Sequence, residues 1–446
     1  MRLDRRRCGR EAGRDEGIFD LAQTDTGAPS ASTRRVLAAS LVGTAVETYD
    51  FYIYGTAASL VFGPLFFPKS SASAQLLFSY ATFAVAFIAR PLGAAFFGHF
   101  GDRIGRKSTL VASLMTMGLS TLLIAFLPGY AQAGWVAPFL LCALRFGQGF
   151  GLGGEWGGAV LLAVENAPPG WRARFGMFPQ LGSPVGFLLA NGLFLALGLV
   201  LTGDAFKDWG WRLPFVASVA LVGVGLWIRL RIGETPEFRR AMAKAEASHV
   251  PLSEVLKRHP LSLLSATLAV VACFAIFYIA TAFALGYGVG TLHYDRETFL
   301  AVQLGAMLFM AGGIALAGYA ADKTSPRAVL MAGCVGTVLV GALMSPMMGA
   351  GSLIAVWGWL SATLFVMGFV YGPLGAFLPS LFPPRVRYSG GAVAFSLGGV
   401  IGGGLTPSVA ELLAHNKGLW AVGLYLAAAG VLSLFGLLLV KPRYEG

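Results

Sequence analysis

The chain has 446 residues, of which 56% are hydrophobic and 12% charged, and its formal net charge is +11. A soluble domain carries roughly 25% charged residues, so this composition argues against a soluble protein and indicates a membrane protein with many spans. The positive charge could indicate nucleic-acid binding. However, the lysines and arginines gather in alternate loops, which is the pattern of membrane topology, and we expect no nucleic-acid partner.

The first segment, residues 1–35, differs in composition from everything that follows. It is rich in Arg, Asp, Gly, Ser and Thr, and it contains no apolar run. The pattern of a secretory signal is also missing, so we expect a disordered cytoplasmic tail.

About twelve apolar segments follow, each long enough to cross a hydrocarbon core of ~30 Å. The basic loops fall on the side that also holds both ends of the chain, which predicts cytoplasmic termini. We therefore predict an all-α membrane protein. The expected spans are 36–66, 76–98, 108–128, 134–162, 174–202, 211–232, 261–289, 298–321, 327–346, 351–381, 387–413 and 418–441.

The first span carries two acids and a tyrosine, Glu47, Asp50 and Tyr54. Their spacings of three and seven place them on one face of a helix. A charge near mid-bilayer costs at least ~2.5–3.5 kcal/mol, so two carboxylates there need a partner, a proton or a wet cavity. We expect them to bind protons or substrate, and the alternative is a structural salt bridge to a neighbouring helix.

The second span contains Arg90 and leads into a glycine-rich, charged loop. We expect Arg90 to extend its guanidinium to the inner interface, with a gating role as the alternative. The loop should latch neighbouring helices at the cytoplasmic face, although it could also act only as a positive anchor. The residues expected to form this gate are Gly98, Asp102, Arg103, Gly105, Arg106 and Lys107.

The fourth span contains Arg145, Gln148 and Glu155 within an arc of ~80°. Arginine is the natural bidentate partner of a substrate carboxylate, but Arg145 could equally well pair permanently with an acid of the first span. Trp156 is expected to pack against lipid or another helix. The surrounding glycines should allow close helix contact. They also match a dinucleotide-binding pattern, which we reject because no strand precedes them.

A charged segment, 233–260, divides the spans into two halves, 36–232 and 261–441. The eighth span ends at Gly318 and Asp322, which repeats the spacing of Gly98 and Asp102 at the end of the second span. Asp322 is therefore expected at the cytoplasmic gate too, in a weaker latch because Ser325 and Pro326 replace the Gly-Arg pair of the first copy. Halves with matching loops are typical of transporters built from repeats.

The loop at 98–107 resembles the signature loop of the major facilitator superfamily. Further segments resemble its metabolite:proton symporter family, and these are 47–55, 90–93, 145–158, 209–212, 234–238 and 382–387. The resemblance, which extends over about residues 36–440, implies two six-helix bundles around a central cavity. It also implies proton-coupled uptake across an inner membrane of a small metabolite, such as shikimate, 2-oxoglutarate, citrate, proline or betaine.

We therefore expect a monomeric secondary transporter that takes up a small carboxylate or zwitterion by alternating access, with protons, the substrate and the bilayer as its partners. Arg145 would bind the substrate's negative group, Glu47 and Asp50 would carry the proton, and Glu155 is a further candidate. The alternatives are an uncoupled facilitator or exporter, and a transporter-like sensor. We find no hydrolytic triad, phosphate loop or metal-binding pattern, and expect neither enzyme activity nor a cofactor.

Overall fold

The computed structural model describes residues 31–104, 106–153, 156–231, 251–383 and 386–439. In these ranges ten helical rods are long and apolar enough to cross a membrane. The shorter helix Val111–Ile124 and the more polar rod Ala31–Phe66 bring the described rods to the twelve that the sequence predicts. The first rod already begins at Ala31, within the expected tail, and the rest of that tail lies outside the described residues.

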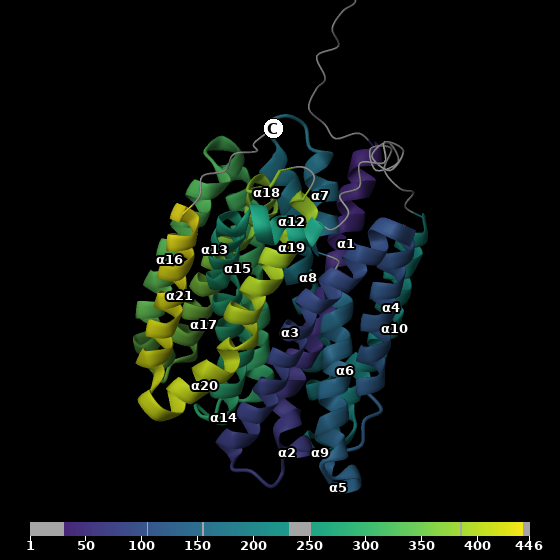
Figure 1. The fold of residues 1–446 in the computed structure, drawn as a ribbon. Coiled ribbons are helices and arrows are strands. Elements are labelled where there is room, and N and C mark those ends of the chain that lie inside the picture. Colours follow the sequence, from purple (N-terminus) through teal and green to yellow (C-terminus); the bar gives the residue numbers. More distant parts are fainter. Residues whose placement is uncertain (1–30, 105, 154–155, 232–250, 384–385, 440–446) are drawn as a thin grey trace, which may run out of the picture.

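The rods of the first half are drawn in purple to teal in Figure 1. Short helices α5 (Tyr130–Ala133) and α9 (Gly203–Asp208) lie in its connections. The rods themselves are α1–η1–α2 (Ala31–Ala57, Ala58–Phe62, Gly63–Phe66), α3 (Ala72–Ile104), α4 (Arg106–Ile124), α6–α7 (Val136–Leu152, Trp156–Glu165), α8 (Arg172–Val200) and η2–α10 (Gly210–Arg212, Leu213–Arg231).

The second half is drawn in green to yellow and follows the short helix α12 (Pro251–Arg258). Of the predicted loop 233–260, only the part from Pro251 onward is described. The rods of this half are α13–η3–α14 (Pro260–Tyr278, Ile279–Phe283, Ala284–Gly290), α15 (Arg296–Lys323), α16 (Pro326–Met348), α17–α18 (Leu353–Tyr371, Leu374–Ser380), α19–η4–α20 (Arg387–Gly399, Val400–Gly404, Thr406–Lys417) and α21 (Leu419–Leu439).

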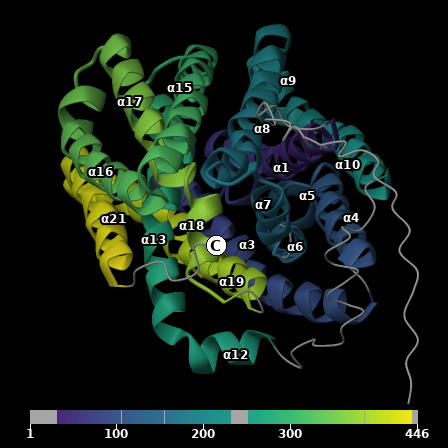
Figure 2. The same ribbon diagram turned by 90° about the horizontal axis from the view of Figure 1, so that it is seen from above.

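The two halves meet through equivalent rods. The second rod of the first half, α3, packs against η4 and α20 in the fifth rod of the second half. Conversely, α15, the second rod of the second half, packs against α8, the fifth rod of the first half. Figure 2 shows these rods at the seam between the two groups of helices. This reciprocal pairing is the structural counterpart of the repeat seen in the sequence.

Ser325 and Pro326, where the second copy of the loop departs from the first, have a local structural use. The Ser325 hydroxyl accepts a hydrogen bond from the backbone amide of Ala328 at 3.1 Å, and Pro326 occupies the first turn of α16. Serine at the N-cap followed by proline is a favourable helix start. The changed residues therefore begin α16.

The glycines of the fourth span bring α6 into close contact with α3 and α4, as the sequence predicts. A methyl group on Gly149 would lie 2.1 Å from the carbonyl oxygen of Ala86, and one on Gly151 would lie 2.8 Å from that of Ser113. Side chains at these positions would push the helices apart, so the glycines allow α6 to pack closely against α3 and α4.

Within the described ranges, three rods contain a π-helical turn, η1, η3 and η4. In η3 the widened turn offers carbonyl oxygens to side-chain donors, because the regular i→i+4 pattern is interrupted. The amide of Gln303 donates to the carbonyls of Ala280 and Thr281, at 3.0 and 2.9 Å. The hydroxyl of Tyr80, on α3 of the other half, donates to the carbonyl of Ala282 at 2.7 Å. The π turn of the seventh rod is therefore a contact point between the halves.

Candidate functional site

Arg145 is fully buried in α6 inside a cage of aromatic rings. Its guanidinium carbon lies 3.9 Å from the ring centre of Tyr54, 4.1 Å from that of Phe51 and 5.1 Å from that of Phe83. Such contacts stabilise a buried cation because the ring faces carry partial negative charge. Tyr54, predicted on the acidic face of the first span, is part of this cage and donates its hydroxyl to Thr82.

A chain of hydrogen bonds leads from Arg145 to Asp50. Arg145 Nη1 donates to Gln148 Oε1 at 3.0 Å, Gln148 Nε2 donates to Thr121 Oγ1 at 2.7 Å, and Thr121 Oγ1 donates to Asp50 Oδ2 at 3.1 Å. The structure thus brings together four residues of α1, α4 and α6, three of which the sequence singled out. Thr121 was missed because a single threonine in an apolar span gives no signal of its own.

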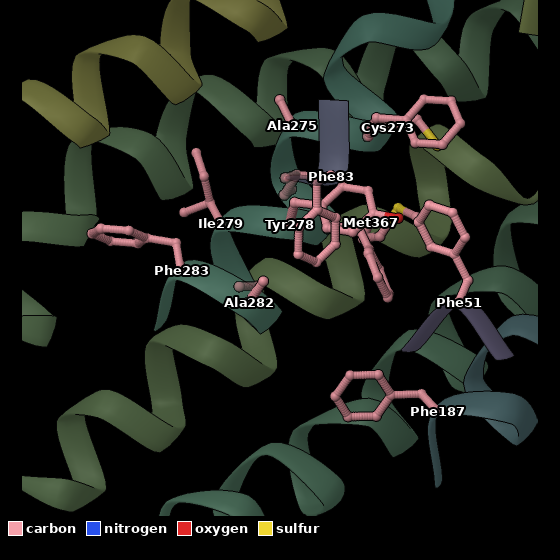
Figure 3. Packing of buried hydrophobic residues seen from close by; sticks show 14 of the residues in the cluster. Phe51, Phe83, Phe187, Cys273, Ala275, Tyr278, Ile279, Ala282, Phe283 and Met367 are labelled. Carbon is pink, nitrogen blue, oxygen red and sulfur yellow. The ribbon is translucent and has the colours of Figure 1, made fainter. Parts of the chain in front are cut away.

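A cavity of about 70 Å³ lies between the two halves, with room for several water molecules. Glu47 lines it, and so do residues from both halves of the chain. Its wall consists of Thr44, Glu47, Thr48, Phe51, Tyr52, Arg90, Leu152, Trp156, Ser183, Cys273, Phe274, Phe277, Tyr278, Met367, Tyr371 and Phe395. Arg145 is outside this set. Figure 3 shows three of these lining residues, Phe51, Tyr278 and Met367, within the packing of buried side chains.

Arg90 lines the cavity, and the expectation that it extends to the inner interface is wrong. Its side chain is 6% exposed and lies over the rings of Phe395, Phe87 and Phe274, at 5.5, 5.7 and 5.9 Å from their centres. The sequence itself contains the information that excludes this expectation. Arg90 precedes the loop aspartate at 102 by about 18 Å of helix at 1.5 Å per residue, which is further than an arginine side chain reaches.

Trp156 also faces the cavity, in contact with the other half of the chain. Its ring stacks on Phe395 with 3.9 Å between ring centres and 1° between planes. Its Nε1 donates to Gln180 Oε1 at 3.3 Å, and Gln180 Nε2 donates to the carbonyl of Tyr371 at 3.2 Å. The packing expected for Trp156 is therefore helix-to-helix packing across the seam. Glu155, its neighbour, lies outside the described residues.

The predicted gate residue Asp322, near the C-terminal end of α15, joins the two halves through its contacts with α8. Its carboxylate accepts from the backbone amides of Ala173 and Arg174 at 2.8 and 3.1 Å, and from Arg174 Nε at 2.9 Å. Asp322 thus caps the N-terminus of α8, where the helix dipole favours a negative charge. In the first copy of the loop, Gly105 and the side chains at 98–108 lie outside the part of the chain that the structure describes, so Asp102, Arg103, Arg106 and Lys107 are not placed.

The halves also touch at the opposite end. Arg296, at the start of α15, lies over the ring of Phe206 on α9, 3.9 Å from its centre. Its neighbour Asp295 caps α15, and hydrogen bonds from the backbone amide and the hydroxyl of Thr298 hold the pKa of this carboxyl below its usual range. Together with the hydrogen bond from Tyr80 to Ala282, these contacts join the halves at this end, as the Asp322 latch joins them at the other.

One buried acid escaped the sequence reading. Glu411 in α20 is 8% exposed, and its Oε2 has no hydrogen-bond partner among the described residues. It lies in the eleventh span, far along the chain from the acids of the first and fourth spans. The described cysteines Cys142, Cys273 and Cys334 are unpaired, and within the described ranges no group of His, Cys, Asp and Glu could hold a metal ion.

Comparisons with known proteins agree with this architecture. The family model of sugar (and other) transporters matches residues 36–260. The chain is 45% identical to the inner membrane metabolite transport protein YhjE of Escherichia coli, over 94% of this chain and 96% of the relative. It is 36% identical to the E. coli shikimate transporter, over 96% and 97%. It is 30% identical to the proline/betaine transporter of Salmonella typhimurium, over 90% and 82%.

The fold is also similar to a solved structure, the partially occluded inward-open conformation of the xylose transporter XylE from E. coli. The TM-score is 0.72 at 16% sequence identity, over 94% of this chain and 99% of that one. At this identity the likeness concerns the fold alone.

Proposed function

Because the chain belongs to the major facilitator superfamily of membrane transporters, we propose that it couples inward proton flow to the uptake of a small organic acid or zwitterion. The observation that carries the proposal is the placement of Glu47. This carboxylate lines a cavity between the two halves of the chain together with Arg90, and contacts join the halves at both ends of the molecule. A carboxylate at such a place can take up a proton together with substrate when the cavity opens to one side, and release it to the other.

The buried chain from Arg145 to Asp50 gives the protein a second group that can respond to protons. Protonation of Asp50 would remove the charge that balances Arg145, and the cost of an unbalanced buried charge would favour rearrangement of α1 against α6. Gln148 and Tyr54 hold Arg145 in place during this change. Glu155 remains a further proton-carrying candidate.

We propose that the bundles are 36–232 and 261–441, with both termini and the loop 233–260 in the cytoplasm of a cell whose inner membrane holds the protein as a monomer. The gate at that face would comprise Asp322 and the loop residues Asp102, Arg103, Arg106 and Lys107, with Gly98 and Gly105 allowing close approach. The charge distribution of the loops supports this orientation.

Two relatives suggest the substrate class. The names of the shikimate transporter and the proline/betaine transporter refer to molecules that each carry a carboxylate. An uncoupled facilitator or exporter of a similar metabolite is the first alternative, and a membrane sensor that binds ligand without net flux is the second.

The test uses purified protein in proteoliposomes with an imposed pH gradient and a panel of labelled shikimate, 2-oxoglutarate, citrate, proline and betaine. We expect accumulation of one of them that stops when an uncoupler is added. Accumulation that an uncoupler leaves unchanged would favour the facilitator, and binding with no flux in either direction would favour the sensor. Liposomes containing Glu47→Gln are the matched control, because their exchange of substrate should persist while uphill accumulation is lost.

A further inference from the structure

Two buried arginines lie near the seam between the halves, and their surroundings differ in one decisive respect. Arg145 is fully enclosed and lines no described cavity, whereas Arg90 lines the central cavity. Phe51 stands between them, since its ring packs against the Arg145 guanidinium and against Phe87, whose ring in turn lies under Arg90. A substrate in the cavity can therefore meet Arg90 directly and meets the aromatic layer before Arg145.

We propose that Arg90, rather than Arg145, binds the carboxylate of the substrate, and that Glu47 competes with that carboxylate for Arg90, which selects hydroxylated monocarboxylates over zwitterions. The inference rests on the proposed transport function and gives it a substrate class. It assigns substrate binding to a residue that the sequence analysis expected at the inner interface.

The hydrogen-bonding capacity of Arg90 supports this assignment. Its side chain is more than nine-tenths buried, yet its Nε has no hydrogen-bond partner within the described ranges. A buried donor left in this state is costly, and a guanidinium binds a carboxylate through two parallel N–H···O bonds. A carboxylate of the substrate would satisfy the donor and would balance the charge at the same time.

The balance of charge in the cavity sets how many carboxylates a bound substrate can carry. Arg90 and Glu47 are its two charged lining residues among those described, so the cavity is neutral while Glu47 is ionised. One proton on Glu47 leaves a single positive charge, which one carboxylate neutralises. A second carboxylate would leave a net negative charge in a site of low dielectric, where an unbalanced charge is expensive.

The three rings under Arg90 are not available to a quaternary ammonium substrate. A box of aromatic rings is the usual receptor for such a cation. Here the faces of Phe87, Phe274 and Phe395 already lie under the protein's own guanidinium, and Phe395 is stacked on Trp156.

Hydroxyl-bearing side chains make up much of the remaining wall. Tyr278, Tyr371 and Tyr52 line the same cavity as Arg90. Ser183, hydrogen-bonded to Tyr52, extends this polar side of the cavity. A ligand that carries hydroxyl groups next to its carboxylate can form hydrogen bonds here that an aliphatic betaine cannot.

The competition between Glu47 and substrate predicts that binding depends on pH. The charged and titratable side chains that share the cavity with Glu47 are Arg90 on α3, Tyr52 on α1, Cys273 and Tyr278 on α13, and Tyr371 on α17. Of these, Glu47 is the group that becomes neutral on acidification. Its protonation releases Arg90, so affinity for a monocarboxylate should rise as the pH falls.

The test measures ligand binding to the purified full-length chain in detergent by calorimetry. The probes are shikimate, quinate and 4-hydroxybenzoate, their uncharged methyl esters, glycine betaine and proline. We expect at least one of the three acids to bind, and its ester to bind at least tenfold more weakly. Arg90→Gln should weaken binding of the acid at least tenfold, and Arg90→Lys should restore part of it. Arg327→Gln is the control, because this half-buried arginine donates to Leu437 outside the cavity.

The outcomes separate the inference from the function on which it rests. Unchanged affinity in folded Arg90→Gln, or binding of betaine or proline in preference to all three acids, overturns the inference while transport stands. If wild-type protein binds and transports none of the probes of either panel, the proposed function fails as well. If Arg90→Gln does not fold, the variant Glu47→Gln tests the proposed competition instead. It should bind the acid with the same affinity from pH 5 to 8, and a pH dependence equal to that of wild type overturns the competition.

Discussion

The two buried arginines of the first half show how similar residues serve different purposes. Arg145 is sealed by three aromatic rings and is joined to Asp50 through Gln148 and Thr121. Arg90 also lies over three rings, but it borders a cavity whose wall includes an acid. Both arginines have donors without a hydrogen-bond partner among the described residues, Nε in Arg90 and both Nε and Nη2 in Arg145. Burial therefore does not distinguish a structural arginine from a binding one. The difference lies in whether the arginine borders the cavity between the halves.

The largest expected effect comes from removing the sealed arginine. Arg145→Gln leaves Asp50 without its balancing charge, and breaking a buried charged network in this way costs about 3–5 kcal/mol. The apparent melting temperature of the purified protein should therefore fall more than in Arg90→Gln, where water in the cavity can solvate Glu47. The double variant Arg145→Gln/Asp50→Asn should recover part of the loss. Equal losses in the two single variants would contradict the distinction between the arginines.

Some features of the two arginine sites can be predicted from the sequence and others cannot, for physical reasons. Twelve rods and their approximate ends follow from hydropathy, because a lipid environment forces apolar, internally hydrogen-bonded helices. The closeness of Arg145 to Gln148 follows from helical spacing, and the glycine contacts follow from the absence of side chains. These features are local, and a pattern in one span contains the information.

The cavity could not be predicted in the same way, because its wall comes from helices that are distant in sequence. Nothing in the seventh or tenth span indicates that Tyr278 and Tyr371 surround an arginine of the second span. The first span presented Glu47 and Asp50 as one acidic face, yet in the structure Glu47 lines the cavity and Asp50 joins the sealed chain. Two acids about one turn apart on the same helix face can thus belong to different sites. Only the packing of the neighbouring helices shows to which site each acid belongs.

A substitution at the contact between the two arginine-bearing helices should disturb both sites. Gly149→Ala places a methyl group 2.1 Å from the Ala86 carbonyl oxygen, so α6 must move away from α3. Overpacking of this kind costs about 1–3 kcal/mol. Melting temperature and transport should both fall. Gly192→Ala in α8 is the matched control, since a methyl group there meets nothing within 4 Å, and an equal effect in the control would refute the packing explanation.

Opening the latch should expose the cavity and leave the sealed network unchanged. Asp322→Asn removes the ion pair with Arg174 and weakens the cap of α8, which together favour separation of the halves at that end by about 1–2 kcal/mol. Cys273, which lines the cavity and is 1% exposed, provides a native reporter. A small thiol reagent should label it several-fold faster in Asp322→Asn, and bound substrate should slow the labelling. The Cys273→Ser background gives the signal that arises from other cysteines, and an unchanged rate would show that Asp322 does not hold the cavity closed.

The smallest effect concerns the wall that positions Arg90. Trp156 stacks on Phe395, and Phe395 lies under the Arg90 guanidinium, so Trp156→Ala should loosen the arginine without removing it. Stacked aromatic pairs contribute about 0.5–1.5 kcal/mol, which corresponds to roughly two- to tenfold weaker binding of a monocarboxylate. Trp156→Phe keeps an aromatic ring for the stack and loses the hydrogen bond to Gln180, so its affinity should lie between those of wild type and Trp156→Ala. Trp420→Ala is the control, because Trp420 is exposed. If calorimetry gives the same affinity for Trp156→Ala as for Trp420→Ala, the stack of Trp156 on Phe395 does not contribute to binding by Arg90.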